Sequence, residues 1–471
     1  MGSMGDVRSL SRRMVRPEPT SLRPLEPKTI HLTPWDLKNI TVEHIQKGIL
    51  LPKPPTTGGH VDVERLASSF AGAIGRFYPY AGRLVVAVAP QSQSLIISLR
   101  CSGEGAEFIH AMAPAITIAD VTASPVVPRV VWSFFPLDGL LGVDAAAGSR
   151  PVLAKQVTEL ADGVFIAVLM NHGTADGTTF WQFFNTWSEL SRAGAGDDVI
   201  NSMPLPVFDR SFVGSCCAVP IPLPSRRGCL TLPFGKLDDV VGQRVHLFPP
   251  VQECFVHFSA ASVKELKAKS NAEMSGSGTG STISSLQVLL AHLWRAVCRA
   301  RRLSPDQETA YIVLVGYRVR VGGIPASYAG NAVGIITAKS TAGDIVGKGL
   351  GWAAWLLNRA VASCDEASTR DKLASWPQEP SFNCLPAIVA AVPTRTFTGS
   401  SPRFDVYRND FGWGAPVAVR SGSGNKVDGK ATVYAGRAGG GSMALEVCLA
   451  PEALARLVAD EEFMSATSTV E

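Results

Sequence analysis

A short apolar run that leads through a glycine-flanked turn into an amphipathic segment is the feature that most constrains this chain. Residues 163–170 are apolar and rich in β-branched side chains, which is typical of a buried strand. After the turn, aromatic and aliphatic residues recur at helical spacing as far as Leu190. The sequence therefore predicts an α/β unit in which a strand ends, and a helix begins, within residues 171–177.

The predicted turn carries His172, with Asp176 four residues later and Gly177 directly after it. A neutral imidazole can accept a proton and return it near pH 7, so a histidine here suits a general base. A buried histidine satisfied by hydrogen bonds is the structural alternative. Asp176 could hold the imidazole tautomer, cap the following helix or pair with an arginine, and the spacing leaves all three open.

Length and composition narrow the class of protein. A chain of 471 residues exceeds the usual size of one hydrophobic core, so we expect two domains. The apolar fraction of 46% and the charged fraction of 18% are typical of a well-packed soluble protein. The net charge of +4 is weak for a nucleic-acid binder. No apolar run approaches the roughly 18 residues that cross a membrane, so we expect no membrane partner.

Cysteine usage and absent motifs exclude further classes. The nine cysteines show no CxxC spacing, so neither a disulfide framework nor a zinc site is predicted. HExxH and GxSxG are also missing from the sequence, which argues against a zinc protease and a serine hydrolase. The N-terminus lacks the apolar core of a signal peptide. We therefore expect a cytoplasmic protein without a bound metal.

Strand and helix patterns recur on both sides of a loosely patterned, proline-rich stretch. We predict a first domain over residues 1–192, a crossover loop over 193–250 and a second domain over 251–471. In the first domain we expect a helix at 61–78, a strand at 126–135, and extended or turn geometry at Pro34. In the second domain we expect a Gly/Ser loop at 275–281, strands at 254–258, 311–315, 431–434 and 442–449, and helices at 262–269, 284–299 and 350–362.

Several motifs together are specific. Residues 172–177 read HGTADG, residues 410–414 read DFGWG, and residues 77–84 read FYPYAGRL. With these motifs the chain resembles, over nearly all its length, the plant BAHD family of CoA-dependent acyltransferases. Leu32–Leu37 and Phe183–Trp187 are similar to a subgroup known mostly as uncharacterised acetyltransferases, which neighbours the cuticle-related members.

This resemblance implies a fold and a reaction. The fold is α/β with mixed sheets, in two pseudo-symmetric domains like chloramphenicol acetyltransferase, with His172 midway along a channel between them. The reaction is transfer of an acyl group from acyl-CoA, a co-substrate rather than a bound cofactor, to a hydroxyl or amine of a small plant metabolite. His172 would act as the general base without an acyl-enzyme, in a monomer. The alternative is a divergent member that acts as a lyase or as a small-molecule binding protein.

The resemblance also assigns roles to the two motifs. Asp176 and Gly177 are structural, with Asp176 turned from the channel toward an arginine. The second motif shapes the channel through Asp410, Phe411, Gly412, Trp413 and Gly414. Its aspartate is expected to pair with an arginine, for which we select Arg318. The strand end 316–320, which reads GYRVR, departs from the family pattern because it lacks a polar residue between the arginines.

Substrate-binding candidates follow from the same reading. The indole N–H of Trp413 is a candidate donor to the oxyanion, with channel packing as the alternative. The phosphates of CoA could be met by Lys267, Lys269 and a helix start at Ser284 and Ser285, although a solvated face and an ordinary cap are alternatives. Thr33 and Trp35 are candidates for the acceptor pocket, with ordinary packing as the alternative.

Overall fold

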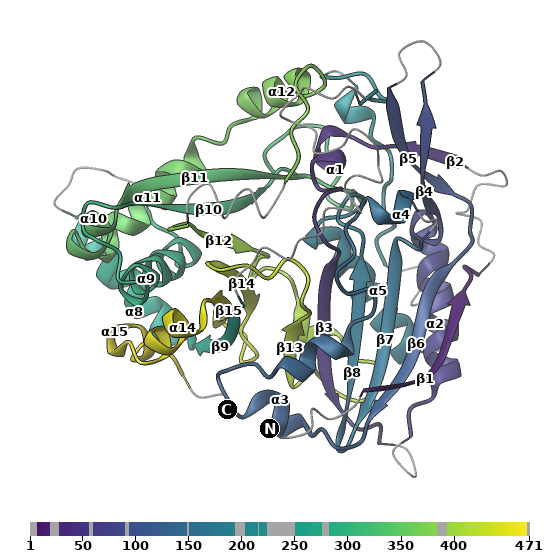
Figure 1. Cartoon of the computed structure of the whole chain (residues 1–471), viewed down its shortest axis with the longest axis horizontal. Helices are drawn as coiled ribbons and strands as arrows, with labels where there is room; N and C mark the ends of the chain where they lie inside the picture. Colours follow the sequence, from purple (N-terminus) through teal and green to yellow (C-terminus); the bar gives the residue numbers. More distant parts are fainter. Residues whose placement is uncertain are drawn as a thin grey trace.

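The computed structural model describes residues 7–18, 28–55, 60–89, 94–147, 150–193, 203–214, 216–223, 250–275, 282–383 and 393–468. The described chain is a mixed α/β protein with two six-stranded sheets and one three-stranded sheet. Each large sheet is packed with helices, and the two assemblies stand side by side (Figure 1). We call the assembly around strand β8 (Gly163–Met170) the first unit and the assembly around strand β10 (Glu308–Gly316) the second unit.

The first sheet has its most buried strand, β8, near its centre. All eight residues of β8 are buried, as the apolar run 163–170 predicted. Helices α2 (Val63–Arg76) and α5 (Gly177–Ala193) pack against each other on this sheet. The strands are, in spatial order, β1 (Arg8–Val15), β6 (Ala106–Ala113), β7 (Leu153–Leu160), β8, β3 (Ile45–Pro52) and β13 (Ala418–Ser421).

The second sheet is packed with helices of the second half of the chain. Helix α9 (Ser285–Ala300) buries most of its side chains in this core, as its apolar spacing predicted. Around it lie α8 (Ala260–Met274), α11 (Leu350–Ala362) and α14 (Pro451–Val458). The strands are, in order, β11 (Val333–Thr341), β10, β12 (Thr396–Gly399), β14 (Lys430–Ala435), β15 (Met443–Leu449) and β9 (Gln252–Phe258).

Shorter elements complete the fold. The small sheet runs β2 (Lys28–His31), β5 (Leu95–Cys101) and β4 (Arg83–Val88). The remaining helices are short: α1 (Pro34–Lys38), η1 (Tyr78–Ala81), α3 (Ile118–Thr122), η2 (Arg129–Phe134), α4 (Asp144–Ala147), η3 (Ser211–Val213), α10 (Ala342–Gly347), α12 (Glu366–Ser375), η4 (Val406–Arg408) and α15 (Glu461–Met464).

The two units exchange backbone segments. Strand β13 lies far along the chain, yet it pairs with β3 at the edge of the first sheet, with Ala418 opposite Leu50. In the other direction, the N–H of Phe255 donates to the carbonyl of Pro125 at 2.7 Å. Strand β13 therefore follows residue 251 in sequence but pairs with the first sheet, where the edge strand β3 offers it N–H and C=O groups.

Three local expectations were wrong or lie outside the described residues. Residues 126–135 do not form a strand; they contain η2, which follows Pro128, a residue with no N–H to give to a sheet. Pro34 begins α1 rather than a turn, because proline suits the first helical position behind the Thr33 cap. Of the predicted Gly/Ser loop at 275–281, residues 276–281 lie outside the described residues, as does most of 193–250.

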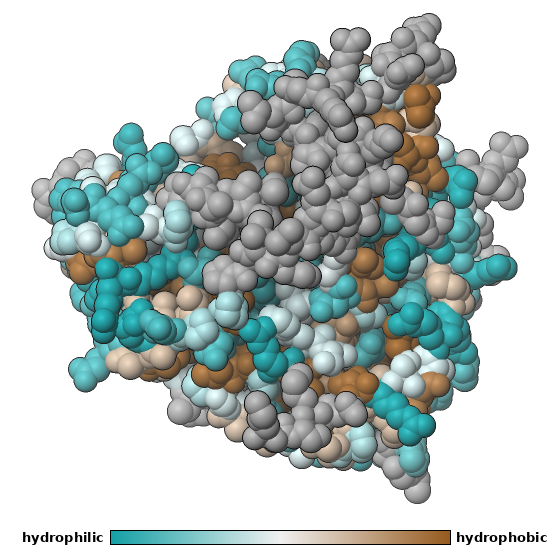
Figure 2. All heavy atoms as spheres, viewed as in Figure 1, coloured by the Kyte–Doolittle hydropathy of each residue, from teal (hydrophilic) through white to brown (hydrophobic). Residues whose placement is uncertain are grey.

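Surface composition agrees with helices that turn one face to solvent. Hydrophilic side chains gather on the left of Figure 2, over α8 and α10. Lys348 and Asp344, for example, form an exposed pair four residues apart at 2.8 Å. Within the described residues, no helix combines the length and the apolar character needed to cross a membrane.

Candidate active site

The histidine lies on a turn that its own neighbours hold. Asn171 follows β8, and its Oδ1 accepts the N–H of Gly173 at 2.9 Å, while its Nδ2 donates to the carbonyl of Gly142 at 2.8 Å. Helix α5 begins at Gly177, where an added side chain would press on the ring of Phe404. The strand, the asparagine and the helix start together fix the direction in which His172 leaves the turn.

Asp176 is turned away from the imidazole and faces Arg318. Its Oδ2 accepts from Nη1 of Arg318 at 2.6 Å, and its Oδ1 accepts from Nη2 at 3.0 Å. Oδ1 also caps α5 by accepting the N–H of Thr179, and Oδ2 accepts the N–H of Ala332. Two of the three roles left open by the sequence, capping and arginine pairing, thus occur together. Burial raises the pKa of Asp176, but the charge and hydrogen bonds of Arg318 lower it. The net shift of the pKa is downward.

The predicted pairing of Arg318 with Asp410 is wrong. Asp410 instead closes its own turn, because its Oδ1 accepts the N–H groups of Gly412, Trp413 and Gly414 at 2.7–2.9 Å. Gly412 and Gly414 have φ of 90° and 95°, a backbone region that favours glycine. The aspartate needs no arginine here because three backbone donors already satisfy one of its oxygens.

The aromatic residues of this second motif pack into the first core. The ring of Phe411 lies 4.8 Å from that of Trp187 on α5, and 6.2 Å from that of Trp413. Both Phe411 and Trp413 are buried in the core that contains β8. Trp413 does not belong to the set of described residues that lines the pocket beside His172. Its proposed role as an oxyanion donor therefore gains no support from its position, whereas the packing alternative does.

Asn331 of the second unit hydrogen-bonds to the backbone of His172. Nδ2 of Asn331 donates to the carbonyl oxygen of His172 at 2.8 Å and to Oδ1 of Asp36 at 3.1 Å. Asp36, on α1, in turn pairs with Arg210 at 3.1 Å. Sequence reasoning assigned no role to these three residues. The signal in the sequence that could have found them was Asp36, which stands among apolar residues. A charge buried in this way needs polar partners.

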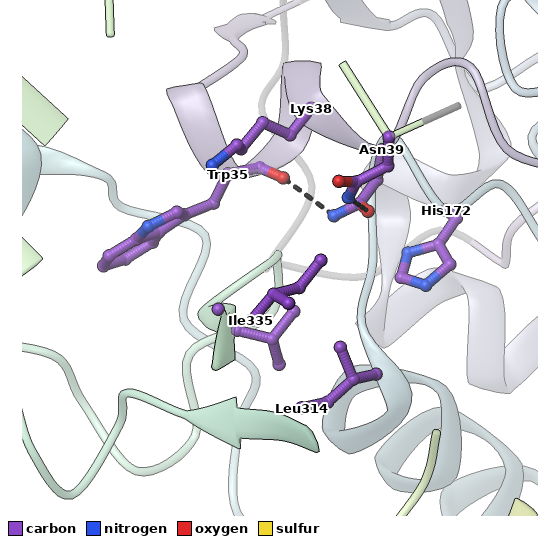
Figure 3. A pocket seen from close by; sticks show the side chains of 9 residues that line it. Trp35, Lys38, Asn39, His172, Leu314 and Ile335 are labelled. Carbon is purple, nitrogen blue, oxygen red and sulfur yellow. Dashed lines mark hydrogen bonds between the residues drawn. The ribbon is translucent and has the colours of Figure 1, made fainter. Parts of the chain in front are cut away.

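His172 lines a small pocket of about 40 Å³ at the junction of the two units. One wall comes from the α1 region and carries polar groups, and the facing wall comes from β10 and β11 and is mainly apolar (Figure 3). This volume holds a few water molecules. The lining residues are Trp35, Lys38, Asn39, His172, Leu314, Val333, Gly334, Ile335 and Asn383.

The environment of His172 favours the neutral imidazole. Burial lowers its pKa, and the carboxylate of Asp176 opposes this effect only in part. The cation of Lys430 adds to the lowering. Nδ1 is buried without a hydrogen-bond partner in the described part of the chain, although the side chain as a whole is only partly buried. Nε2 is therefore the ring nitrogen that a substrate in the pocket can reach.

Of the two residues predicted for the acceptor pocket, Trp35 lines the pocket and Thr33 does not. Trp35 lines the pocket and stacks on Tyr317 at 5.0 Å between ring centroids. Thr33 is fully buried, and its hydroxyl donates to Asp36 at 2.9 Å within the cap of α1. Thr33 therefore belongs to the cap of α1 and is not among the residues that line the pocket. Lys38 and Asn39 do line it, although sequence reasoning did not select them.

The CoA candidates lie on helices of the second unit. Lys267 is partly exposed and Lys269 is exposed on α8. Ser284 caps α9 in a box with Gln287, in which the N–H of Ser284 donates to Oε1 of Gln287 at 2.8 Å, and Ser285 is the first helical residue. Their contact with CoA phosphates stays a prediction.

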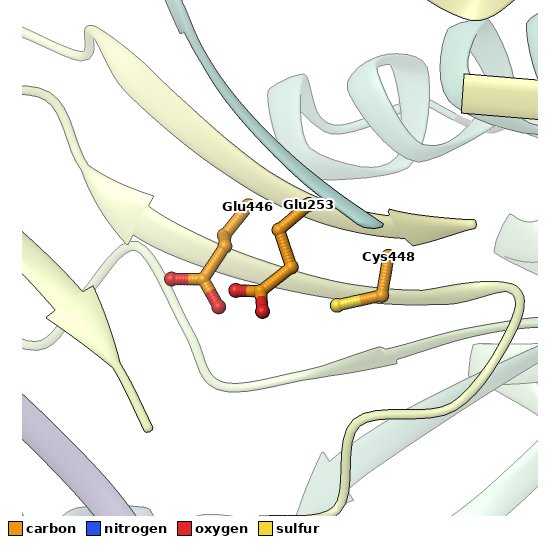
Figure 4. A group of neighbouring side chains, drawn as sticks. All are labelled: Glu253, Glu446 and Cys448. Atoms are coloured by element: carbon orange, nitrogen blue, oxygen red, sulfur yellow. The ribbon is translucent and has the colours of Figure 1, made fainter. Parts of the chain in front are cut away.

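A buried cluster of side chains on β9 and β15 has the composition of a metal site. Glu253, Glu446 and Cys448 bring three potential ligand atoms within 4.8 Å of one another (Figure 4). The ammonium of Lys426 donates to Glu253 at 2.6 Å and also to Glu446. Burial raises the pKa of the Cys448 thiol to about 12, so the sulfur keeps its proton. The lysine thus supplies the positive charge that a metal ion would bring, and the cluster is a buried ion network of the second sheet.

His172 thus lies in a pocket whose lining comes from both units. The Transferase family model matches residues 6–464. An uncharacterised acetyltransferase of Arabidopsis thaliana is 32% identical over 464 residues, which cover 98% of this chain and 99% of the relative. BAHD acyltransferase DCR of the same plant is 31% identical, with 94% and 91% covered. The chain therefore belongs to the BAHD acyltransferase family and is an acyltransferase, as expected from its motifs.

The likeness extends to the fold. The crystal structure of vinorine synthase matches with a TM-score of 0.70 over 98% of this chain and 99% of that chain, at 18% identity. At this identity the match concerns the fold alone. It confirms the α/β fold class of mixed sheets that the resemblance implied.

Proposed function

We propose that this protein transfers an acyl group from acyl-CoA to the hydroxyl or amine of a small plant metabolite, with His172 as general base. The observation that carries the proposal is the position of His172. It is the one basic ring in the described lining of a pocket between the units, and burial lowers its pKa. An imidazole that stays neutral at neutral pH can take a proton from an acceptor.

In the proposed reaction both substrates are bound at the same time, and the acyl group passes directly from one to the other. Nε2 of His172 removes the acceptor proton while the acceptor oxygen or nitrogen attacks the thioester carbonyl. The tetrahedral intermediate collapses, the C–S bond breaks and the CoA thiolate takes the proton back from the imidazolium. A positioned base contributes on the order of 10²–10⁴ in rate. Holding both substrates in one site adds to this by pre-arranging the encounter.

The surrounding residues support this role by fixing the turn. The carbonyl of His172 accepts from Asn331, and Asp176 is engaged by Arg318, so both flanks of the histidine are anchored to the second unit. A single chain supplies both walls of the pocket, and we take a monomer as the working form.

The direct test is acceptor-dependent release of free thiol from acyl-CoA. Purified protein would be incubated with acetyl-CoA, with and without pooled plant alcohols and amines, and the acylated product would be identified by mass spectrometry. Thiol release that depends on an acceptor supports the transferase. The alternative of a lyase or binding protein is favoured if ligands bind, or are cleaved, without any transfer of the acyl label.

A further inference from the structure

Lys38 brings a positive charge to the same pocket as His172. It is the last residue of α1 and is partly buried. Figure 3 shows Lys38 and His172 on either side of Asn39, with Leu314 and Ile335 on the facing strands. The side chain of Lys38 runs toward Trp35, so its ammonium lies at the end of the pocket away from the imidazole, with the apolar wall opposite (Figure 3).

The charge of Lys38 is uncompensated in the described part of the chain. No carboxylate there lies within salt-bridge distance of its ammonium. Burial lowers the pKa of Lys38, and the neighbouring charge that adds to this effect is a second cation, Lys372 on α12. The amides of Asn39 and Asn383, which also line the pocket, are bonded to each other at 2.7 Å. Lys372 is exposed and is not among the residues that line the pocket, so Lys38 is the cation that attracts an anion to this wall.

We propose that Lys38 selects acceptors that carry a carboxylate, which its ammonium binds while the reacting hydroxyl or amine faces His172. The body of such an acceptor would lie on Leu314 and Ile335, residues that are respectively 38% and 41% exposed. Apolar groups left exposed beside a half-buried cation match an amphipathic hydroxy acid or amino acid derivative. This inference rests on the proposed function, since it defines the substrate class of the same site.

The phosphates of CoA are the other source of negative charge. The wall that faces Lys38 is apolar, and an acyl chain or acceptor body suits that wall better than a pyrophosphate does. The acceptor carboxylate is therefore the ligand to which the inference commits. The two sources can be told apart by substituting Lys38. If the lysine binds the acceptor carboxylate, binding of the acid weakens, and if it binds a phosphate, binding of CoA weakens.

The experiment measures binding and needs no turnover. Equilibrium dialysis would give dissociation constants for matched pairs of acid and methyl ester: 3-(4-hydroxyphenyl)propanoate, 12-hydroxydodecanoate and N-acetyltyrosine. We expect wild type to prefer at least one acid over its ester by about ten- to a hundredfold, the range for a hydrogen bond to a charged group. Lys38→Gln should abolish this preference, and Lys38→Arg should retain it.

The control is Lys339→Gln, which removes an exposed lysine of β11 that pairs with Glu308 at 3.5 Å outside the pocket. This variant should keep the preference of wild type. The inference is overturned if no acid is preferred by wild type, or if Lys38→Gln keeps the preference. It is also overturned if Lys38→Gln weakens CoA binding and leaves the acid-to-ester ratio unchanged. Because binding is read directly, loss of acyl transfer alone would count against the proposed function and not against Lys38.

Discussion

Asp176 and Arg318 form a two-pronged ion pair across the two units, with oxygen–nitrogen distances of 2.6 and 3.0 Å. The aspartate side chain is 1% exposed and the arginine side chain 8%. The same guanidinium donates to the carbonyls of Tyr328 and Gly330, so it binds the segment that carries Asn331. The aspartate of the histidine motif therefore holds the two units together, and the imidazole has no carboxylate partner at Nδ1 among the described residues.

Asp176→Asn should mainly reduce stability. The change leaves the buried guanidinium of Arg318 without its counter-charge, and breaking a buried pair in this way costs about 3–5 kcal/mol. Chemical denaturation would measure the loss. The matched control is Asp344→Asn, whose exposed pair with Lys348 should contribute less than about 1 kcal/mol. Unchanged stability combined with a large loss of turnover would instead restore an aspartate–histidine dyad.

His172→Ala should lower kcat by at least about a hundredfold, because the reaction loses its proton acceptor. Thiol release from acyl-CoA measures the rate, and thermal melting checks that the fold is kept. His60→Ala, at an exposed position, is the control and should retain the wild-type rate. Near-normal activity of the His172 variant would remove the general base from the mechanism.

The rate should fall in acid with a midpoint below the ordinary histidine value of about 6.5. Burial lowers the pKa of His172, so the neutral, active imidazole persists to lower pH. The rate is fully present above this pKa and is lost as the pH falls through it. A profile of kcat/KM against pH, on a substrate that does not titrate in this range, gives the midpoint. A midpoint above about 7 would contradict the environment described for this ring.

Folding stability should fall as the pH drops from about 6.5 toward 4, partly through His44. Burial lowers the pKa of His44 to about 4, and its Nδ1 lies 3.1 Å from the carbonyl of Leu140. The unfolded chain takes up this proton first, so the folded state loses stability as pH decreases, by roughly 3 kcal/mol for this one group. Denaturant titrations at several pH values would give the free energy of unfolding at each pH. This free energy should depend less steeply on pH for His44→Gln than for wild type. An unchanged slope would mean that other groups dominate.

Asn331→Ala should reduce kcat more than it raises KM. The variant frees the carbonyl of His172, while Oδ1 of Asp36 keeps the backbone N–H of residue 331 at 3.2 Å. The imidazole therefore loses its fixed direction and the pocket lining stays. The unsatisfied carbonyl should also cost about 1–3 kcal/mol of stability. Asn358→Ala, on α11 with a single bond to Gln287, is the control. Equal changes in kcat and KM for both variants would argue against a positioning role.

Much of the local structure was predictable because periodicity reports burial. The strand 163–170 and the helix 350–362 agree with β8 and α11 at both ends. Failures occurred where a proline decided the backbone, as at Pro34 and Pro128, since the same residue permits a helix start or an extended segment. Sequence also located the histidine turn, because strand, turn and helix signals are adjacent there.

The sequence by itself determined the elements, the histidine motif and the family. Tertiary structure alone decided that Arg318 faces Asp176 across 142 positions of sequence and that Asn331 reaches His172 across 159. It also decided that Lys38 enters the pocket and that β13 joins the first sheet. The physical reason is that helix and strand patterns arise from neighbours along the chain, whereas these pairings depend on how two complete units pack, which no local pattern encodes.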